Sequence, residues 1–357
     1  MDFLTNLWNY ITNGIKTVFY GEPKNEKVLA KSNKNSVFGT PKKKVYKNEI
    51  GMLGSKTDEQ LQTEAVRSHY ITTVKNPNYK LKPGESLATV AKKYGIEERS
   101  MLDANSLTKE TAKKLQAGKV LKVPPSRKVK NIRNLSDVSK AMGVSIDFIK
   151  KLKRAEDSAK FGDNKFHNTP YVDDAGVKTI GIGHVLKKGE SQRLSNAQVC
   201  ELLAKDLLKA EENLYSVMGG KNNYDKLPQP IKEALLDMTF NKGTDIITKT
   251  PGLLYTLKAG KYEAAINKMT YSKSNNTGKD MSGLCKRRIF DISLAAKIYN
   301  GKIPQSNLNT VQQLYNKGVH LLREECKKSG LNFNNMLAGY NKDINAYMGN
   351  RIKLITK

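Results

Sequence analysis

The feature that most constrains the fold of this chain is a helical pattern followed, after a spacer, by two short strand patterns. Ile146, Ile149 and Leu152 recur at helical spacing and predict the buried face of a helix, and Glu156 lies four residues further along that face. The segment YVDDAGVKTIGIGHVL (171–186) then reads as two strands joined by a turn. A helix, a small β-hairpin and a largely helical remainder predict an α+β fold.

Two acidic residues of this region, Glu156 and Asp173, are candidates for acid–base catalysis. Glu156 is either a structural, paired charge or a carboxyl at a cleft whose pKa is raised by desolvation. Asp173 ends the first strand pattern and Thr179 lies on the second, where Gly181 and Gly183 allow a close backbone approach. Cleavage of a glycosidic bond needs one protonated carboxyl and one ionised carboxylate across a cleft. Glu156 on an apolar face and Asp173 on an exposed strand edge predict this division of roles.

These residues, in the string Asp-x5-Thr-Ile-Gly-Ile-Gly-His, resemble the phage-type lysozymes, the T-even-like muramidases, and the segments LSNAQVCELLAKDL, LPQPIKEALLDMTFNKG and GLCKRR follow in the family's order. The resemblance covers residues 145–302 and implies a lysozyme-like domain with a helix, a small β-hairpin sheet and a helical lobe. It implies Glu156 as the acid and Asp173 as the base. Thr179 and Asp173 would hold the attacking water, which makes the enzyme inverting. Glu156 and Asp173 are 17 positions apart, more than is usual, and Asp157 stands where a glycine is usual.

The same resemblance implies supporting roles for five further residues. His184 would form a structural ion pair with Asp206; a metal ligand or catalytic base is the alternative for His184, but no second ligand stands near it in the sequence. Phe240 and Asn241 would line the substrate cleft, with core packing as the alternative for Phe240. Arg287 would brace the acid or bind wall-peptide carboxylates, with an exposed salt bridge as the alternative.

Residues 79–124 carry a separate pattern of strand, helix, helix and strand. YKLKPG enters a turn, Ser86 can cap a helix that ends at Gly95, and KVLKVP alternates as a closing strand. This segment resembles a LysM module, a small βααβ domain that binds glycans containing N-acetylglucosamine. The resemblance implies a glycan groove between two loops, although each loop residue could instead serve only to turn the chain. The loop residues are Gly84, Glu85 and Ser86 on one side and Gln116 and Ala117 on the other.

The remaining segments have simpler patterns. Residues 1–20 predict an amphipathic helix that packs on its own protein or on a partner, with peripheral membrane attachment as the alternative. Residues 21–78 are rich in Lys, Asn, Gly and Ser and predict a basic flexible linker. Residues 125–144 predict a connector and a short helix without flanking strands, and residues 303–357 predict a helical extension.

Composition narrows the function classes. Lys and Arg total 62 against 34 Asp and Glu, and the net charge of +28 favours contact with polyanions such as nucleic acid, an anionic membrane or a bacterial wall. No nucleic-acid recognition module is visible, so we expect no nucleic-acid partner. The 3 cysteines and 4 histidines lack the spacing of a disulfide scaffold or a metal site, and we expect no cofactor. The sequence shows neither a spanning helix nor a signal peptide.

These patterns together predict a peptidoglycan hydrolase that cleaves the β-1,4 bond between N-acetylmuramic acid and N-acetylglucosamine. We expect a phage endolysin, made in the host cytoplasm and acting on the periplasmic wall after release. One alternative is a virion-associated lysozyme used at entry, whose terminal helices bind other virion proteins. Another is a non-catalytic glycan-binding protein on a lysozyme scaffold.

Overall fold

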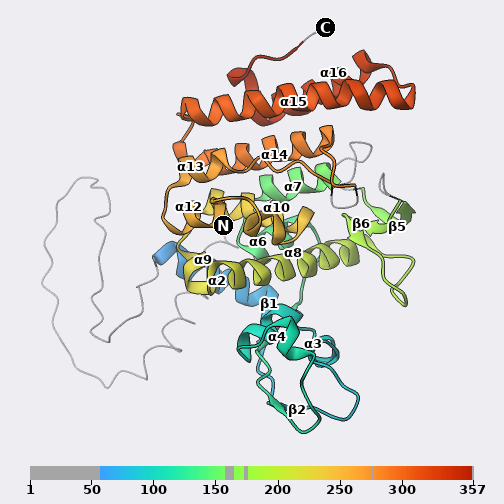
Figure 1. Ribbon diagram of the computed structural model, residues 1–357, viewed down its shortest axis with the longest axis vertical. Helices are drawn as coiled ribbons and strands as arrows, with labels where there is room; N and C mark the ends of the chain where they lie inside the picture. Colours follow the sequence, from blue (N-terminus) through green and yellow to red (C-terminus); the bar gives the residue numbers. More distant parts are fainter. Residues whose placement is uncertain (1–56, 157–164, 173–175, 275–276, 356–357) are drawn as a thin grey trace, which may run out of the picture. The chain divides into compact units, whose positions relative to one another are not determined.

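The computed structural model describes residues 57–156, 165–172, 176–274 and 277–355 (Figure 1). The chain divides into two units, Met1–Ala65 and Val66–Lys357. Of the first unit, only the start of helix α2 (Asp58–Tyr70) is described, so the helix predicted over residues 1–20 lies outside the described residues. The second unit contains the rest of α2 and all the other described helices and strands.

The segment 79–124 folds as the strand and helix pattern predicts. Strand β2 pairs with β3 in antiparallel register, with Tyr79 opposite Leu121. Ser86 caps helix α3 through a capping box with Thr89, and Gly95 ends that helix with φ +65°. A short third helix, α5, was not predicted. The elements are β2 (Tyr79–Lys80), α3 (Leu87–Tyr94), α4 (Glu98–Ala104), α5 (Lys109–Ala112) and β3 (Val120–Leu121), and their buried side chains form a separate small core.

The end of the segment predicted as a flexible linker, residues 21–78, is instead folded, and residues 21–56 lie outside the described residues. Helix α2 and strand β1 (Ile71–Val74) occupy its end, and β1 pairs with β4 (Ser126–Val129), with Ile71 opposite Val129. The connector after the module therefore does have a flanking strand, contrary to the prediction. Two four-residue strands, far apart in sequence, become strands only by pairing with each other, which explains why neither has a clear pattern of its own.

A helical hairpin follows, as predicted, and ends at Glu156. Helix α6 (Leu135–Met142) stops at Gly143, whose φ is +62°, and helix α7 (Ile146–Glu156) begins three residues later. The predicted buried face was wrong in one residue: the side chain of Ile146 is 40% exposed, whereas Phe148 is fully buried. Ile146 is the first residue of α7 and lies beyond the end of the packed face, which is centred on Ile149 and Leu152.

The β-hairpin is a three-stranded antiparallel sheet in the order β5-β6-β7. The second predicted strand is broken into β6 (Lys178–Gly181) and β7 (His184–Val185), because Gly181 and Gly183 adopt φ of +66° and +72° and reverse the chain. Strand β5 (His167–Val172) begins within the segment that separates Glu156 from the hairpin. Thr179 of β6 lies opposite Tyr171 of β5 on one side and Val185 of β7 on the other.

The helical lobe is built around the long helix α8 and the central helices α10 and α14. Figure 1 shows α14 lying between α10 and the C-terminal pair α15 and α16. The helices of this lobe are α8 (Asn196–Met218), α9 (Lys221–Asp225), α10 (Gln229–Lys242), α11 (Asp245–Thr248), α12 (Leu253–Lys258), α13 (Tyr262–Asn267), α14 (Ser282–Ala295) and the 3-10 helix η2 (Ala296–Tyr299).

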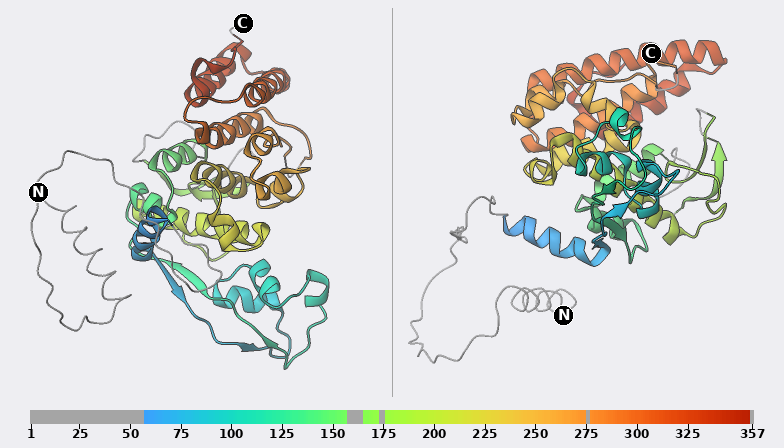
Figure 2. Two further views of the ribbon diagram at one scale, coloured as in Figure 1. Left: turned by 90° about the vertical axis from the view of Figure 1, so that its left-hand side faces the viewer. Right: turned by 60° about the horizontal axis from the view of Figure 1, so that its bottom comes forward.

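The C-terminal extension packs on this lobe and extends its core. It consists of α15 (Gln305–Ser329), α16 (Phe333–Met348) and the short 3-10 helix η3 (Gly349–Arg351). The apolar residues of α15 that recur at helical spacing are all buried: Val311, Leu314, Tyr315, Val319 and Leu322. Figure 2 shows the pair from two further directions. Among the described residues, no helix has both the length and the apolar character that crossing a membrane requires.

Candidate functional site

Glu156 is the last residue of α7 and lies between an arginine and the β6–β7 turn. Nη2 of Arg287 is 2.9 Å from Oε1 of Glu156, and the two side chains are 8% and 17% exposed. On the other side, a Cβ atom added to Gly183 would lie 2.7 Å from Oε2 of Glu156. Only a glycine permits this approach, so the turn and the acid are fitted to each other.

The second carboxylate of the predicted pair, Asp173, lies outside the described residues. Its separation from Glu156 therefore stays a prediction. Thr179, the third predicted residue, is 3% exposed, and its hydroxyl donates a hydrogen bond to the carbonyl of Val177 at 3.1 Å. The structure places Thr179 on the middle strand of the small sheet, two residues before the turn that contacts Glu156.

His184 is held between two carboxylates. Its Nδ1 lies 2.7 Å from Oδ2 of Asp206 on α8, which is the contact expected from the sequence, and its Nε2 lies 3.1 Å from Oε2 of Glu190. The hydrogen bond with Asp206 raises the pKa of His184 above its usual value, burial opposes this effect, and Glu190 adds to it. With a carboxylate at each ring nitrogen, His184 joins β7 of the hairpin to α8.

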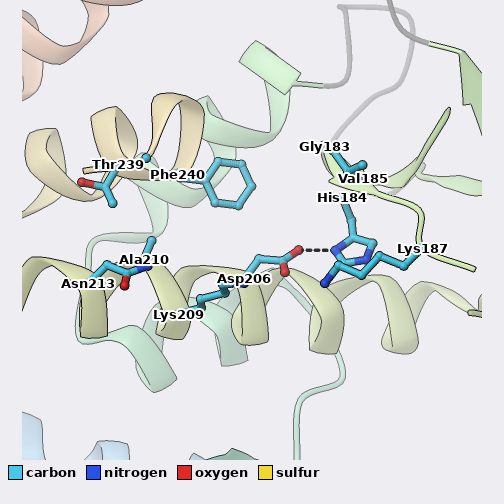
Figure 3. Close-up of a pocket in the computed structure, with 11 residues that line it drawn as sticks. Gly183, His184, Val185, Lys187, Asp206, Lys209, Ala210, Asn213, Thr239 and Phe240 are labelled. Atoms are coloured by element: carbon cyan, nitrogen blue, oxygen red, sulfur yellow. Dashed lines mark hydrogen bonds and ion pairs between the residues drawn. The ribbon is translucent and has the colours of Figure 1, made fainter. Parts of the chain in front are cut away.

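A cavity of about 280 Å³ lies between the β6–β7 turn, α8 and α10 (Figure 3). The close-up shows the Phe240 ring pointing from α10 toward the turn, and the Asp206 carboxyl pointing to His184. Gly183 lines the cavity and also lies close to Glu156, so Glu156 is adjacent to the cavity. The lining residues are Gly183, His184, Val185, Lys187, Asp206, Lys209, Ala210, Asn213, Thr239, Phe240 and Gly243.

Of the two residues predicted to line the substrate cleft, one lines this cavity and the other does not. Phe240 lines the cavity, but Asn241 does not; its Oδ1 instead accepts a hydrogen bond from Nη2 of Arg288 at 3.3 Å. Of the three roles considered for Arg287, the contacts fit a brace for Glu156, because the arginine is buried and not an exposed salt bridge.

Two residues of this site were missed from the sequence. Asp237 on α10 is fully buried and accepts two hydrogen bonds from Arg287, at 2.6 Å to Nε and 2.7 Å to Nη2. Asp291 on α14 is also fully buried and lies 2.8 Å from Nε of Arg288. A signal was present for Asp237: it stands in the apolar run ALLDMTF, where a charged residue needs a buried partner.

The two loops predicted to bind glycan lie at the same end of the β2–β3 pair. Leu81 exchanges backbone hydrogen bonds with Gly118 and Lys119, which brings the loop after β2 beside the loop before β3. Several polar side chains have local partners: the Glu85 carboxylate accepts hydrogen bonds from the Tyr79 hydroxyl and the Lys82 amide, and Ser86 caps α3. The predicted residues exposed at this end are Gly84, Ser86, Gln116 and Ala117.

Known families match both regions. The phage lysozyme family matches residues 164–290, and the LysM domain family matches residues 79–124. The peptidoglycan hydrolase gp36 of Enterobacteria phage SP6 is 25% identical over 181 residues, which is 45% of this chain and 18% of that protein. The chain thus spans less than a fifth of the length of this relative.

Solved structures resemble the lysozyme region. The active form of the P1 phage endolysin Lyz is 18% identical, with a TM-score of 0.38, and the match covers 48% of this chain and 97% of that chain. The muramidase domain of SpmX from Asticaccaulis excentricus is 22% identical, with a TM-score of 0.33, and the match covers 43% of this chain and 96% of that chain. By the two family matches, the chain carries a LysM domain followed by a domain of the phage lysozyme family.

Proposed function

We propose that this chain is a peptidoglycan hydrolase, a muramidase that cleaves the β-1,4 bond between N-acetylmuramic acid and N-acetylglucosamine. The observation that carries the proposal is the position of Glu156. It ends a helix whose apolar face is buried, it contacts Arg287, and it lies against the glycine turn that also forms one wall of the cavity. A carboxyl there is mostly shielded from water yet close to a space that can hold a sugar.

In this mechanism Glu156 gives its proton to the leaving glycosidic oxygen as the bond breaks. Asp173 is the ionised carboxylate and, together with Thr179, holds the water that attacks the anomeric carbon. The reaction then inverts the configuration at that carbon, and the two carboxyl groups would be ~6.5–9.5 Å apart to leave room for the water. No cofactor takes part.

The cavity supports binding of a glycan chain. The Phe240 ring offers an apolar face for a sugar ring, while Asn213 offers a polar group for hydroxyl or N-acetyl substituents. Lys187 and Lys209 add positive charge at the same cavity, which suits a polymer that carries peptide carboxylates.

We propose that the LysM domain binds the same polymer through the loops that contain Gly84, Glu85, Ser86, Gln116 and Ala117. A weak glycan-binding site on the same chain as the enzyme raises the local concentration of an insoluble substrate. The net charge of +28 adds an attraction to anionic wall material that salt would screen.

We propose that the protein acts as an endolysin, reaching the periplasmic wall from the host cytoplasm at lysis. Packaging in the phage particle for use at entry is the alternative, with partners bound through residues 1–20 or the exposed side of α15 and α16. Mass spectrometry of purified particles separates the two: the chain should be absent from particles if it is an endolysin and present if it is a virion component.

The central test replaces each carboxyl in turn. Glu156→Gln and Asp173→Asn should each lower the rate of wall hydrolysis by about 10²–10⁴-fold, because a general acid or base is removed. Both variants should still sediment with purified peptidoglycan, since the LysM domain is intact. Full lytic activity in either variant would refute the assignment.

The products test the bond and the stereochemistry. Mass spectrometry of digested peptidoglycan should find reducing-end N-acetylmuramic acid, and proton NMR at early times should find the α-anomer as the first product. Anhydromuramic acid products would indicate a transglycosylase instead.

A further inference from the structure

The arginine that contacts Glu156, Arg287, also binds a second carboxylate, which is buried. Nε and Nη2 of Arg287 donate to the two oxygens of Asp237 at 2.6 and 2.7 Å, and the same Nη2 lies 2.9 Å from Glu156. Asp237 is fully buried on α10, while Glu156 is partly exposed at the end of α7. One guanidinium from α14 therefore links two carboxyls from two other helices.

This arrangement answers a difficulty in the mechanism. A positive charge within about 4 Å of a carboxyl favours its ionised form, and a general acid must keep its proton. Arg287 alone would therefore orient Glu156 and also promote loss of the proton that catalysis needs. The negative charge of Asp237, bound to the same Nη2, reduces that effect, because it partly offsets the charge of Arg287 at Glu156.

We propose that Asp237 is a positioning residue that fixes the guanidinium of Arg287 and balances its charge, so that Arg287 orients the carboxyl of Glu156 without favouring its ionisation. This inference rests on the proposed role of Glu156 as the acid. Asp237 acts through Arg287 and does not contact the substrate.

The surroundings of Arg287 support a balanced network. Asp237 and Glu156 raise the pKa of Arg287, although burial opposes them, so this group stays charged. Burial raises the pKa of Asp291 well above its usual range, Arg288 opposes this shift, and Asp237 adds to it.

Helix α16 also borders this network. Burial and Asp343 raise the pKa of Tyr347, and Arg287 opposes them, which places this phenol near the arginine as a neutral group. Among the described residues, the groups around Arg287 thus come from α7, α10, α14 and α16, and Asp237 is the one fully buried carboxylate that binds it directly.

The test is the pH dependence of kcat/KM on purified peptidoglycan. In Asp237→Asn, Arg287 is no longer balanced and should lower the pKa of Glu156. The alkaline limb of the profile should then move to lower pH by about one unit, a tenfold loss of rate on that limb, with the acid-side plateau kept within about threefold. Asp343→Asn is the matched control: it removes a carboxylate from the 2.6 Å ion pair with Lys286 on the same helix α14, and its profile should not move.

Two further variants distinguish a change in the pKa of Glu156 from a general loss of structure. Arg287→Gln should move the alkaline limb to higher pH, and the limb of the double variant Asp237→Asn with Arg287→Gln should lie between those of the two single variants, because neither charge then acts on Glu156. If circular dichroism finds Asp237→Asn unfolded, the double variant compared with Arg287→Gln decides the question, because removal of Asp237 should then move the alkaline limb to lower pH. An unmoved limb in the folded variants, or an equal loss of rate at every pH, overturns the inference. An inactive wild-type protein would instead refute the proposed function.

Discussion

At the residue scale, the site depends on a glycine whose missing side chain makes room for the acid. Gly183 has φ +72° and faces Glu156 so closely that a Cβ atom would lie 2.7 Å from the carboxyl oxygen. Its neighbour Gly181 has a similar backbone and faces Val199, with a Cβ contact of 3.2 Å. Both glycines allow the chain to reverse between β6 and β7, but only Gly183 touches a residue with a proposed chemical role.

We predict that Gly183→Ala displaces Glu156 and lowers kcat on peptidoglycan by at least about tenfold, because a small misplacement of an acid is costly. Its left-handed backbone should also cost about 1–2 kcal/mol of stability. Gly189→Ala is the control, since Gly189 has φ +88° but no atom within 4 Å of an added Cβ. Similar losses of kcat in both variants, measured beside their unfolding midpoints, would show that strain and not the contact is responsible.

At the element scale, helix α8 organises two ionic groups along its length. Asp206 binds His184 at the cavity, and further along Glu211 binds Arg67 of α2 and Arg127 of β4 at 2.6 and 3.1 Å. Burial alone would raise the pKa of Glu211, but the two arginines outweigh it and lower the pKa to about 2. The helix therefore anchors the hairpin through Asp206 and anchors α2 and β4 through Glu211.

We predict that this carboxylate makes stability depend on acid pH. Because the folded-state pKa of Glu211 is below its usual 4.5, its contribution is complete above pH 4.5 and is lost as the pH falls toward about 2. Glu211→Gln removes the carboxylate that binds Arg67 and one of the two that bind Arg127, whose Nε stays 2.9 Å from Glu212, and should lower the free energy of unfolding by about 3–5 kcal/mol near neutral pH.

Urea unfolding between pH 2.5 and 7 measures the effect of Glu211→Gln. The difference from the wild type should shrink as the pH falls. Glu201→Gln, which removes an exposed ion pair with Lys205 on the same helix, should cost less than about 1 kcal/mol. A constant difference for Glu211→Gln at every pH would contradict the assignment of the charge.

At the scale of the whole molecule, two domains with separate cores share one chain. The LysM domain has its own small core, and the lysozyme domain shares its core with the C-terminal pair α15 and α16. The extension is thus part of the catalytic domain's packing, because it covers α14, the helix that carries Arg287.

We predict that a substitution in the LysM domain slows hydrolysis of the insoluble wall but not hydrolysis of soluble wall fragments. Ala117→Glu places a charge and extra volume in an exposed loop of the LysM domain and should weaken sedimentation with peptidoglycan by about tenfold. Hydrolysis of the intact wall should slow, whereas hydrolysis of soluble wall fragments should stay unchanged, because the cleft is untouched. Thr72→Glu adds the same charge at an exposed position of β1 and is the control. Equal binding by Ala117→Glu and the wild type would place the glycan site elsewhere.

The sequence by itself determined the features that depend on neighbours along the chain. The caps at Ser86 and Gly95, the helical hairpin that ends at Glu156 and the buried face of α15 follow from local turn chemistry and helical periodicity. The same local information placed Gly183 in a close approach, although it did not identify the acid as what it approaches.

Only the tertiary structure decided which distant residues meet. Strand β1 pairs with β4, Ile146 stays exposed at the start of α7, and Asp237 binds Arg287 at a separation of 50 positions. A strand that needs a partner has a weak pattern of its own, and a buried charge is tolerated only where another element supplies the opposite charge. Such pairings depend on how the helices and strands pack in three dimensions, which local spacing does not encode.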